Sequence, residues 1–135
     1  MRRTPVLQAL ILADHIYSDS PSGKKVIAGT FNTLWANRFP TEFVRETYAY
    51  ICLTELRGEA DLSLKYVQLA SNQVLMETTP VPIRSDDPLK TTEICVRVPP
   101  FPMPTPGTYA FEVHVGGEML GSLRILVRQI EEAKS

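Results

Sequence analysis

Residues that commonly carry catalysis or bind metals are scarce in this 135-residue chain. Histidine occurs only as His15 and His114, and cysteine only as Cys52 and Cys95. The sequence has no Cys-x-x-Cys pair, metal-spaced histidine pair, nucleophile motif or phosphate-binding glycine loop. Each cysteine lies in an apolar run, where a free thiol behaves as a small hydrophobic side chain, so no disulfide is expected. We expect a protein that is not an enzyme and uses no cofactor and no metal.

An excess of one charge is also missing, since 14 Lys and Arg face 15 Asp and Glu, for a formal net charge of −1. A surface for nucleic acid or for an anionic membrane normally shows a basic excess, so neither partner is expected. No apolar run reaches the length of a transmembrane span. Arg2-Arg3 and the apolar residues 6–13 imitate a signal peptide, but no small-residue cleavage site follows. We expect a cytoplasmic protein in which this apolar run belongs to a core strand and not to a cleaved leader.

The chain is rich in alternating apolar and polar residues, and residues 106–127 show this pattern best. Two alternating runs flank Gly116-Gly117, which suits the two positive-φ positions of a type I′ hairpin turn. The first run directs Tyr109 and Phe111 to one face of the strand. The second run is one residue out of phase, which predicts a β-bulge at or near Gly121. A hairpin with one apolar face needs a second sheet to cover it.

Similar alternation predicts eight strands in all. Six of them precede the hairpin, at residues 7–17, 24–35, 47–57, 61–70, 73–83 and 91–98. Their number and spacing predict an all-β fold in one domain of residues 1–135, a two-sheet antiparallel sandwich of immunoglobulin-like or related Greek-key type. Tyr109, just after Pro106-Gly107, has the position of a tyrosine corner in such folds. The side chains expected in the core are Phe31, Leu64, Val96, Phe111, Val113 and Ile125.

Two connecting segments are expected to lie outside the sheets. Residues 40–45 have the composition of a single helical turn. In residues 99–106, four of the first six residues are prolines and lack an N–H group. This segment is predicted to be a stiff connector, partly in the polyproline II conformation.

Several segments of the chain resemble a family of short uncharacterised bacterial proteins. They are residues 9–14, 23–31 and 39–43, together with the Pro-Gly-x-Tyr-x-Phe start of the hairpin. The resemblance covers most of the chain and implies a β-sandwich in the bacterial cytoplasm. It implies no established activity and brings no catalytic residues with it.

One end of the predicted sandwich gathers apolar side chains around the proline-rich connector, namely Phe39, Phe43, Phe101 and Met103. Apolar residues on pre-ordered loops bind partners at low entropic cost, and aromatic residues and methionine are enriched in interfaces. The alternative is that these side chains close the end of the core. We favour the interface. The expected function is therefore that of a non-enzymatic module that acts through contact with a protein partner or through self-association.

The opposite end of the predicted sandwich gathers acidic side chains from different loops, namely Asp19, Glu59, Asp86 and Asp87. Carboxylate oxygens are the ligands that calcium uses. A small-ligand or calcium-binding module of C2-like type is therefore the alternative function. Because turns favour aspartate for local hydrogen bonds to the backbone, we expect no calcium binding of consequence.

Overall fold

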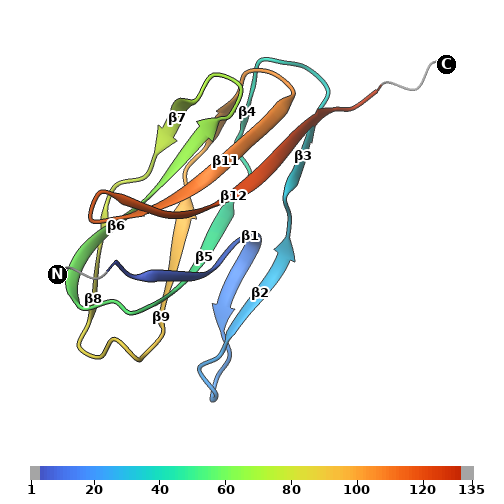
Figure 1. Ribbon diagram of the computed structural model, residues 1–135. Coiled ribbons are helices and arrows are strands. Elements are labelled where there is room, and N and C mark those ends of the chain that lie inside the picture. The colour runs from blue at the N-terminus through green and yellow to red at the C-terminus, as the bar shows by residue number, and fades with distance from the viewer. Residues whose placement is uncertain (1–3, 132–135) are drawn as a thin grey trace.

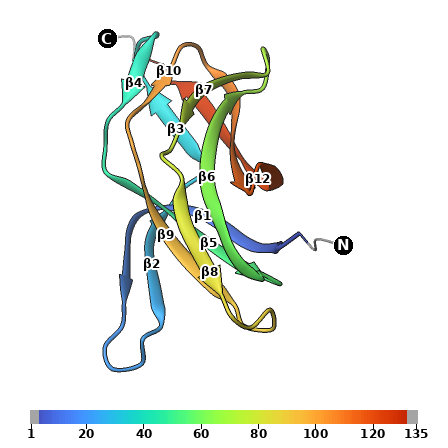
Figure 2. The same cartoon turned by 90° about the vertical axis from the view of Figure 1, so that its left-hand side faces the viewer.

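Alternation along the sequence produces extended strands throughout the chain. The computed structural model describes residues 4–131, and within this range the chain forms twelve β-strands and no helix (Figure 1). These residues accordingly contain no helix with the length and apolarity needed to cross a membrane. Figures 1 and 2 show the strands arranged in two layers. Arg2 and Arg3 lie outside the described residues.

The first layer is a four-stranded antiparallel sheet. Its spatial order is β2 (Lys25–Thr30), β1 (Val6–Ser18), β5 (Thr47–Thr54) and β9 (Thr92–Val98). The first half of β1 pairs with β5 and its second half pairs with β2. The β1–β2 hairpin therefore extends past the end of β5, and Figure 2 shows its turn standing away from the rest of the molecule.

The second layer is a sheet of six strands. Its order is β3 (Thr33–Ala36), β12 (Glu118–Gln129), β11 (Gly107–Val115) and β6 (Gly58–Gln68), followed by β7 (Gln73–Glu77) and β8 (Val81–Ser85), which both pair with β6. β7 and β8 lie end to end, since both run antiparallel to β6. Thr78 continues the ladder between them. Its N–H donates to the Leu64 carbonyl at 2.9 Å, and its hydroxyl accepts the Leu64 N–H at 2.9 Å.

The core lies between the two layers and contains a cluster of aromatic rings. The ring of Tyr66 lies 4.5 Å from that of Phe101, 5.2 Å from that of Tyr109 and 5.1 Å from that of Phe111. All four side chains are fully buried. Of the six residues predicted for the core, five are buried; Phe31, where the chain crosses from β2 to β3, is half-buried against the core.

The late hairpin confirms the register expected from the sequence. Gly116 and Gly117 both have positive φ, at 59° and 86°. The pairing shifts between Val113, opposite Gly121, and His114, opposite Met119, so Leu120 is the extra residue of a bulge. The tyrosine corner is also confirmed, because the Tyr109 hydroxyl donates to the Thr105 carbonyl at 2.6 Å. The protein is an immunoglobulin-like β-sandwich.

The predicted sandwich is present, but it has more strands than the eight expected, and one of its pairings is parallel. The strand expected at residues 24–35 breaks near Asn32, where the chain leaves the first sheet, and becomes β2 and β3. The strand expected at residues 73–83 breaks before Pro80, which has no N–H for a ladder, and becomes β7 and β8. β3 then pairs parallel with β12, far along the chain. A local pattern contains no information about such a partner.

Both segments expected to lie outside the sheets contain a short strand. β4 (Thr41–Phe43) replaces the predicted helical turn, and β10 (Phe101–Met103) lies within the predicted proline connector. The two strands pair antiparallel, with Phe101 opposite Phe43 and Pro102 opposite Glu42. Because β4 precedes β5 and β10 follows β9, this ladder extends the β5–β9 pair past a break and folds over the end of the core.

Candidate functional site

The outer surface of the first sheet is formed by the residues that alternate with its core residues. Along β5, Ala49, Ile51 and Leu53 are fully buried against the second sheet. Since successive side chains of a strand point to opposite faces, Tyr48 and Tyr50 point away from the core. In the described part of the chain no helix or further sheet forms a third layer, so this face is uncovered.

Cross-strand pairing arranges this surface as three rows of three residues. The rows are Ala9–Cys52–Glu93, Ile11–Tyr50–Cys95 and Ala13–Tyr48–Arg97, each running from β1 through β5 to β9. We call these nine residues the outer face; Ala13 is fully buried beneath its neighbours, whereas the other eight are half-buried or exposed. Its centre is apolar and aromatic, and its β9 side is exposed and carries one charge of each sign.

The two tyrosine hydroxyls of the outer face are held by carboxylates. Tyr50 donates to Glu93 across the β5–β9 pair, and Tyr48 donates to Glu46, two residues before it in the chain. These hydrogen bonds raise the pKa of Tyr50 and that of Tyr48 above the ordinary tyrosine value, because an anionic acceptor favours the protonated phenol. Both phenols stay neutral at physiological pH, which suits them to contact rather than to acid–base chemistry.

Both cysteines belong to the outer face and both are free. Cys95 is exposed and lies opposite Tyr50, whereas Cys52 is half-buried and lies opposite Glu93. The two histidines are elsewhere. His114 points away from the core on the second sheet, but its side chain is only 13% exposed and its Nε2 lies 3.0 Å from Glu112 Oε1. His15 is exposed on the β1–β2 hairpin.

The predicted partner surface at the proline-rich end was wrong, because its residues close the core. Phe101 is 0% exposed and Met103 is 3% exposed. The Phe43 ring stacks on that of Phe101 at 5.0 Å, and the Arg45 guanidinium lies 5.7 Å from the centroid of the Phe43 ring. Phe39 is half-buried against the same cluster. Four apolar side chains that pack on one another cannot be presented to a partner in this state.

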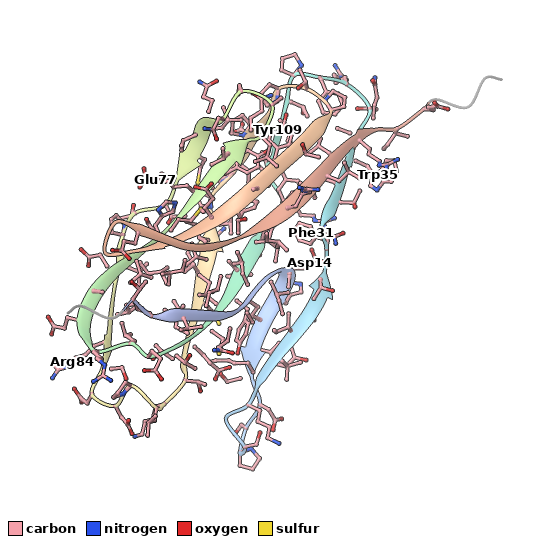
Figure 3. All side chains as sticks on the ribbon, in the orientation of Figure 1. Asp14, Phe31, Trp35, Glu77, Arg84 and Tyr109 are labelled. Atoms are coloured by element: carbon pink, nitrogen blue, oxygen red, sulfur yellow. The ribbon has the colours of Figure 1, made fainter. Side chains whose placement is uncertain are left out.

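The predicted convergence of Asp19, Glu59, Asp86 and Asp87 was wrong as well. Arg84, at the lower left of Figure 3, lies between two of them, 3.5 Å from Glu59 and 3.3 Å from Asp86. Asp87 accepts the N–H of Leu89 at 3.0 Å, a local turn bond, and Asp19 accepts the hydroxyl of Ser22 in the β1–β2 turn. Within residues 4–131 no three His, Cys, Asp or Glu side chains gather as metal ligands do.

The surface formed by residues 4–131 includes two depressions that bear on ligand binding. One, of about 220 Å³, opens between β1 and β12 and is lined by Leu10, Ile11, Leu12, Thr30, Phe31, Asn32 and Leu123. The other, of about 400 Å³, lies over β6 and β8 and includes the Glu59–Arg84 pair. Ligand pockets usually enclose roughly 300–1,000 Å³ and direct several polar groups at the ligand. The first depression is smaller than this and mainly apolar, and in the second the Arg84 guanidinium is already paired with Glu59.

The outer face could not be assembled from the sequence, although part of it could be recognised. Alternation places Tyr48, Tyr50 and Cys52 on one side of their strand, and Glu93, Cys95 and Arg97 on one side of theirs. The pairing of β5 with β9, and of both with β1, depends on tertiary contacts that a local pattern does not report. The sequence therefore predicts two rows of side chains, of which only the row on residues 91–98 was predicted to point outward, and it does not predict how the rows pair.

Comparison with known proteins shows that residues 8–128 match a family of unknown function, DUF6941. No curated protein is similar enough in sequence to match the chain. Among solved structures, a crystal structure of an immunoglobulin-like protein from Pseudomonas aeruginosa is similar, with a TM-score of 0.43 and 15% sequence identity. The similarity covers 93% of this chain and 98% of that one.

Proposed function

The chain belongs to the DUF6941 family, whose function is unknown, and from this premise we propose that it is a non-enzymatic module that acts through protein–protein contact. The observation that carries the proposal is the uncovered outer face. Its middle row, Ile11–Tyr50–Cys95, is apolar and aromatic, and Glu93 and Arg97 lie at its rim. An aromatic centre with a polar rim is the usual composition of a protein interface.

Rigidity supports the same proposal. The outer face is built on three paired strands, so its backbone is ordered before any partner arrives and binding loses little conformational entropy. Tyr50 is further fixed by its hydrogen bond to Glu93. As part of this proposal we place the protein in the bacterial cytoplasm, because the exposed Cys95 and its neighbour Cys52 are free thiols, and reducing compartments keep thiols in that form.

Site-specific photo-crosslinking tests the proposal. Ile11, half-buried in the outer face, is replaced by benzoyl-phenylalanine, and cells of the native host that produce the variant are irradiated. The matched control carries the same group at Arg124, which is exposed on the outer side of the second sheet. The expected result is a discrete crosslinked protein from position 11 and none from position 124. Absence of a product from position 11, or the same products from both positions, would overturn the proposal.

A further inference from the structure

We propose that β9 pairs antiparallel with β9 of a second copy of this chain, about a two-fold axis at Cys95, so that the two four-stranded sheets become one continuous sheet. This inference rests on the proposed function, because it names a partner for the sheet that carries the outer face. It begins from the position of β9, which ends the order β2-β1-β5-β9. β5 pairs with one side of β9, and in residues 4–131 no strand pairs with the other.

β9 is also an edge without the usual protection. It pairs with β5 in unbroken register from Thr92 to Val98 and contains no proline, glycine or bulge. Natural sheets block free edges with such features, with very short strands or with charged side chains, above all lysine. β9 does carry two exposed charges, Glu93 and Arg97, but they are of opposite sign and so do not oppose pairing with a copy of itself. The other edge strands formed by residues 4–131 are blocked in these ways. β3, β4 and β10 are only three or four residues long. β2 contains Lys25 and Gly29, β7 contains a bulge, and β8 contains Pro82.

The direction of the backbone groups of β9 follows from one hydrogen bond. The Leu12 carbonyl accepts the N–H of Phe31 at 3.2 Å, so the backbone of Leu12 points away from β5. Leu12 and its partner Ala49 in β5 are therefore a non-hydrogen-bonded pair, and the N–H and C=O groups of Ala49 point away from β1. They bond the backbone of Val96 in β9 instead. By alternation, the N–H and C=O groups of Glu93, Cys95 and Arg97 point to the open side. Three residues with exposed side chains therefore also present the free backbone groups.

These three residues form a self-complementary set. With the axis at Cys95, Glu93 lies opposite Arg97 of the second copy and Arg97 opposite its Glu93, while the two Cys95 residues face each other. All three pairs are of the hydrogen-bonded kind, which exchange two bonds each, or about six bonds in total. A shift of two residues in either direction separates both charge pairs, so the charges select one register. An isologous contact of this kind closes as a dimer rather than extending into a fibre.

The two faces of the joined sheet support the same register. On the inner side, Ile94 lies opposite Val96 of the second copy, which continues the apolar core layer across the axis. On the outer side, the row Ile11–Tyr50–Cys95 meets its own copy. Ile94 is half-buried in one copy, although it belongs to the core layer, because the sheet ends there. The second copy covers this open flank.

Charge reversal and its restoration test the pairing. The molar mass of the purified chain is measured by light scattering during size exclusion, for the wild type, for Glu93→Arg, for Arg97→Glu and for the double reversal Glu93→Arg/Arg97→Glu. Each single reversal opposes like charges in two places, so the dissociation constant should rise about tenfold or more. The double reversal should restore dimerisation. Arg124→Glu, on the other sheet, serves as the control and should remain dimeric.

Chemical crosslinking between the two Cys95 thiols complements the charge variants, because it needs no change at Glu93 or Arg97. A short bis-maleimide alkylates two thiols, and facing residues of a hydrogen-bonded pair have Cα atoms only about 5.5 Å apart. The reagent should therefore link two chains through Cys95 rapidly, with Cys52→Ser still linked and Cys95→Ser not linked. A monomeric wild type, single reversals that leave the dimer intact, or a double reversal that does not restore it would overturn the pairing. The photo-crosslinking from position 11 described above is a separate measurement. A wild type that is monomeric but still gives that crosslinked protein would refute the β9–β9 pairing and leave the proposed function standing.

Discussion

Two fully buried tyrosines in the aromatic cluster, Tyr66 and Tyr109, differ in what their hydroxyls contact. The rings of Tyr66 and Tyr109 stack at 5.2 Å with an interplanar angle of 3°. The hydroxyl of Tyr109 bonds the backbone of Thr105, whereas the buried hydroxyl of Tyr66 has no hydrogen-bond partner among the described residues. A buried polar group without a partner destabilises the folded state by about 1–3 kcal/mol, whereas a satisfied one contributes about 0.5–1.5 kcal/mol.

Removing each hydroxyl should therefore have opposite effects. Tyr66→Phe should leave the free energy of unfolding unchanged or raise it by about 1 kcal/mol, because an unsatisfied group is lost. Tyr109→Phe should lower it by about 1 kcal/mol or more, because the corner bond is lost and the Thr105 backbone stays behind. Urea denaturation of the two variants measures both values. Equal losses in the two variants would show that the Tyr66 hydroxyl has a stabilising contact.

At the scale of elements, the β4–β10 ladder shows where prediction from the sequence failed. The prolines around Phe101 argued against a strand, but a ladder of three residues needs N–H groups only at Phe101 and Met103, on either side of Pro102. The same prolines stiffen the segment and direct two large side chains into the core. The sequence shows apolar residues on a rigid segment. Whether they face solvent or the core depends on β4, which is not a neighbour in the sequence.

The end of the core should therefore be sensitive to substitution in β10. Phe101→Ala should lower the free energy of unfolding by about 3–5 kcal/mol, since it removes a fully buried ring and leaves a cavity beside Tyr66. Val44→Ala, next to the same ladder but with the residue 70% exposed, is the matched control and should cost less than about 0.5 kcal/mol. Denaturant melts of both variants decide the point. A loss of less than about 1 kcal/mol in the free energy of unfolding for Phe101→Ala would show that this side chain is not packed in the core.

The late hairpin is the element that the sequence predicted best, and the reason is physical. Its two strands are joined by a two-residue turn, so the position of the turn alone fixes which residues lie opposite each other. The extra residue of the bulge appears in the sequence as a change of phase. The outer face was recoverable only as separate rows, because β1, β5 and β9 are distant in sequence and their register is fixed by packing.

At the scale of the whole molecule, the tyrosines link stability to alkaline pH. Burial among aromatic rings raises the pKa of Tyr66 above its ordinary value near 10, and hydrogen bonds to carboxylates raise those of Tyr50 and Tyr48. Above pH 10 the unfolded chain therefore releases protons that the folded chain retains. Stability is unaffected by these groups below that pH and falls as the pH rises beyond it.

The contribution of Tyr66 can be isolated by comparing two chains. The free energy of unfolding is measured from about pH 9 to pH 11 for the wild type and for Tyr66→Phe. Above pH 10, Tyr66 should lower that of the wild type by up to about 1.4 kcal/mol per pH unit, in addition to the losses that both chains share. Tyr66→Phe should show a shallower decline, since it cannot ionise. Denaturant midpoints measured across this range give both slopes. Parallel slopes would mean that Tyr66 ionises as easily in the folded chain as in the unfolded one.

The parallel pairing of β3 with β12 has a consequence for how the chain folds as it is made. β3 occupies residues 33–36 and its neighbour in the sheet occupies residues 126–129. Until the ribosome has synthesised β12, β3 has no strand to join and one flank of β11 stays open. Contacts between such distant segments form slowly, and exposed edges invite association between incomplete chains. The second sheet therefore cannot be completed before β12 has been synthesised, and until then its open edge is available for association with other incomplete chains.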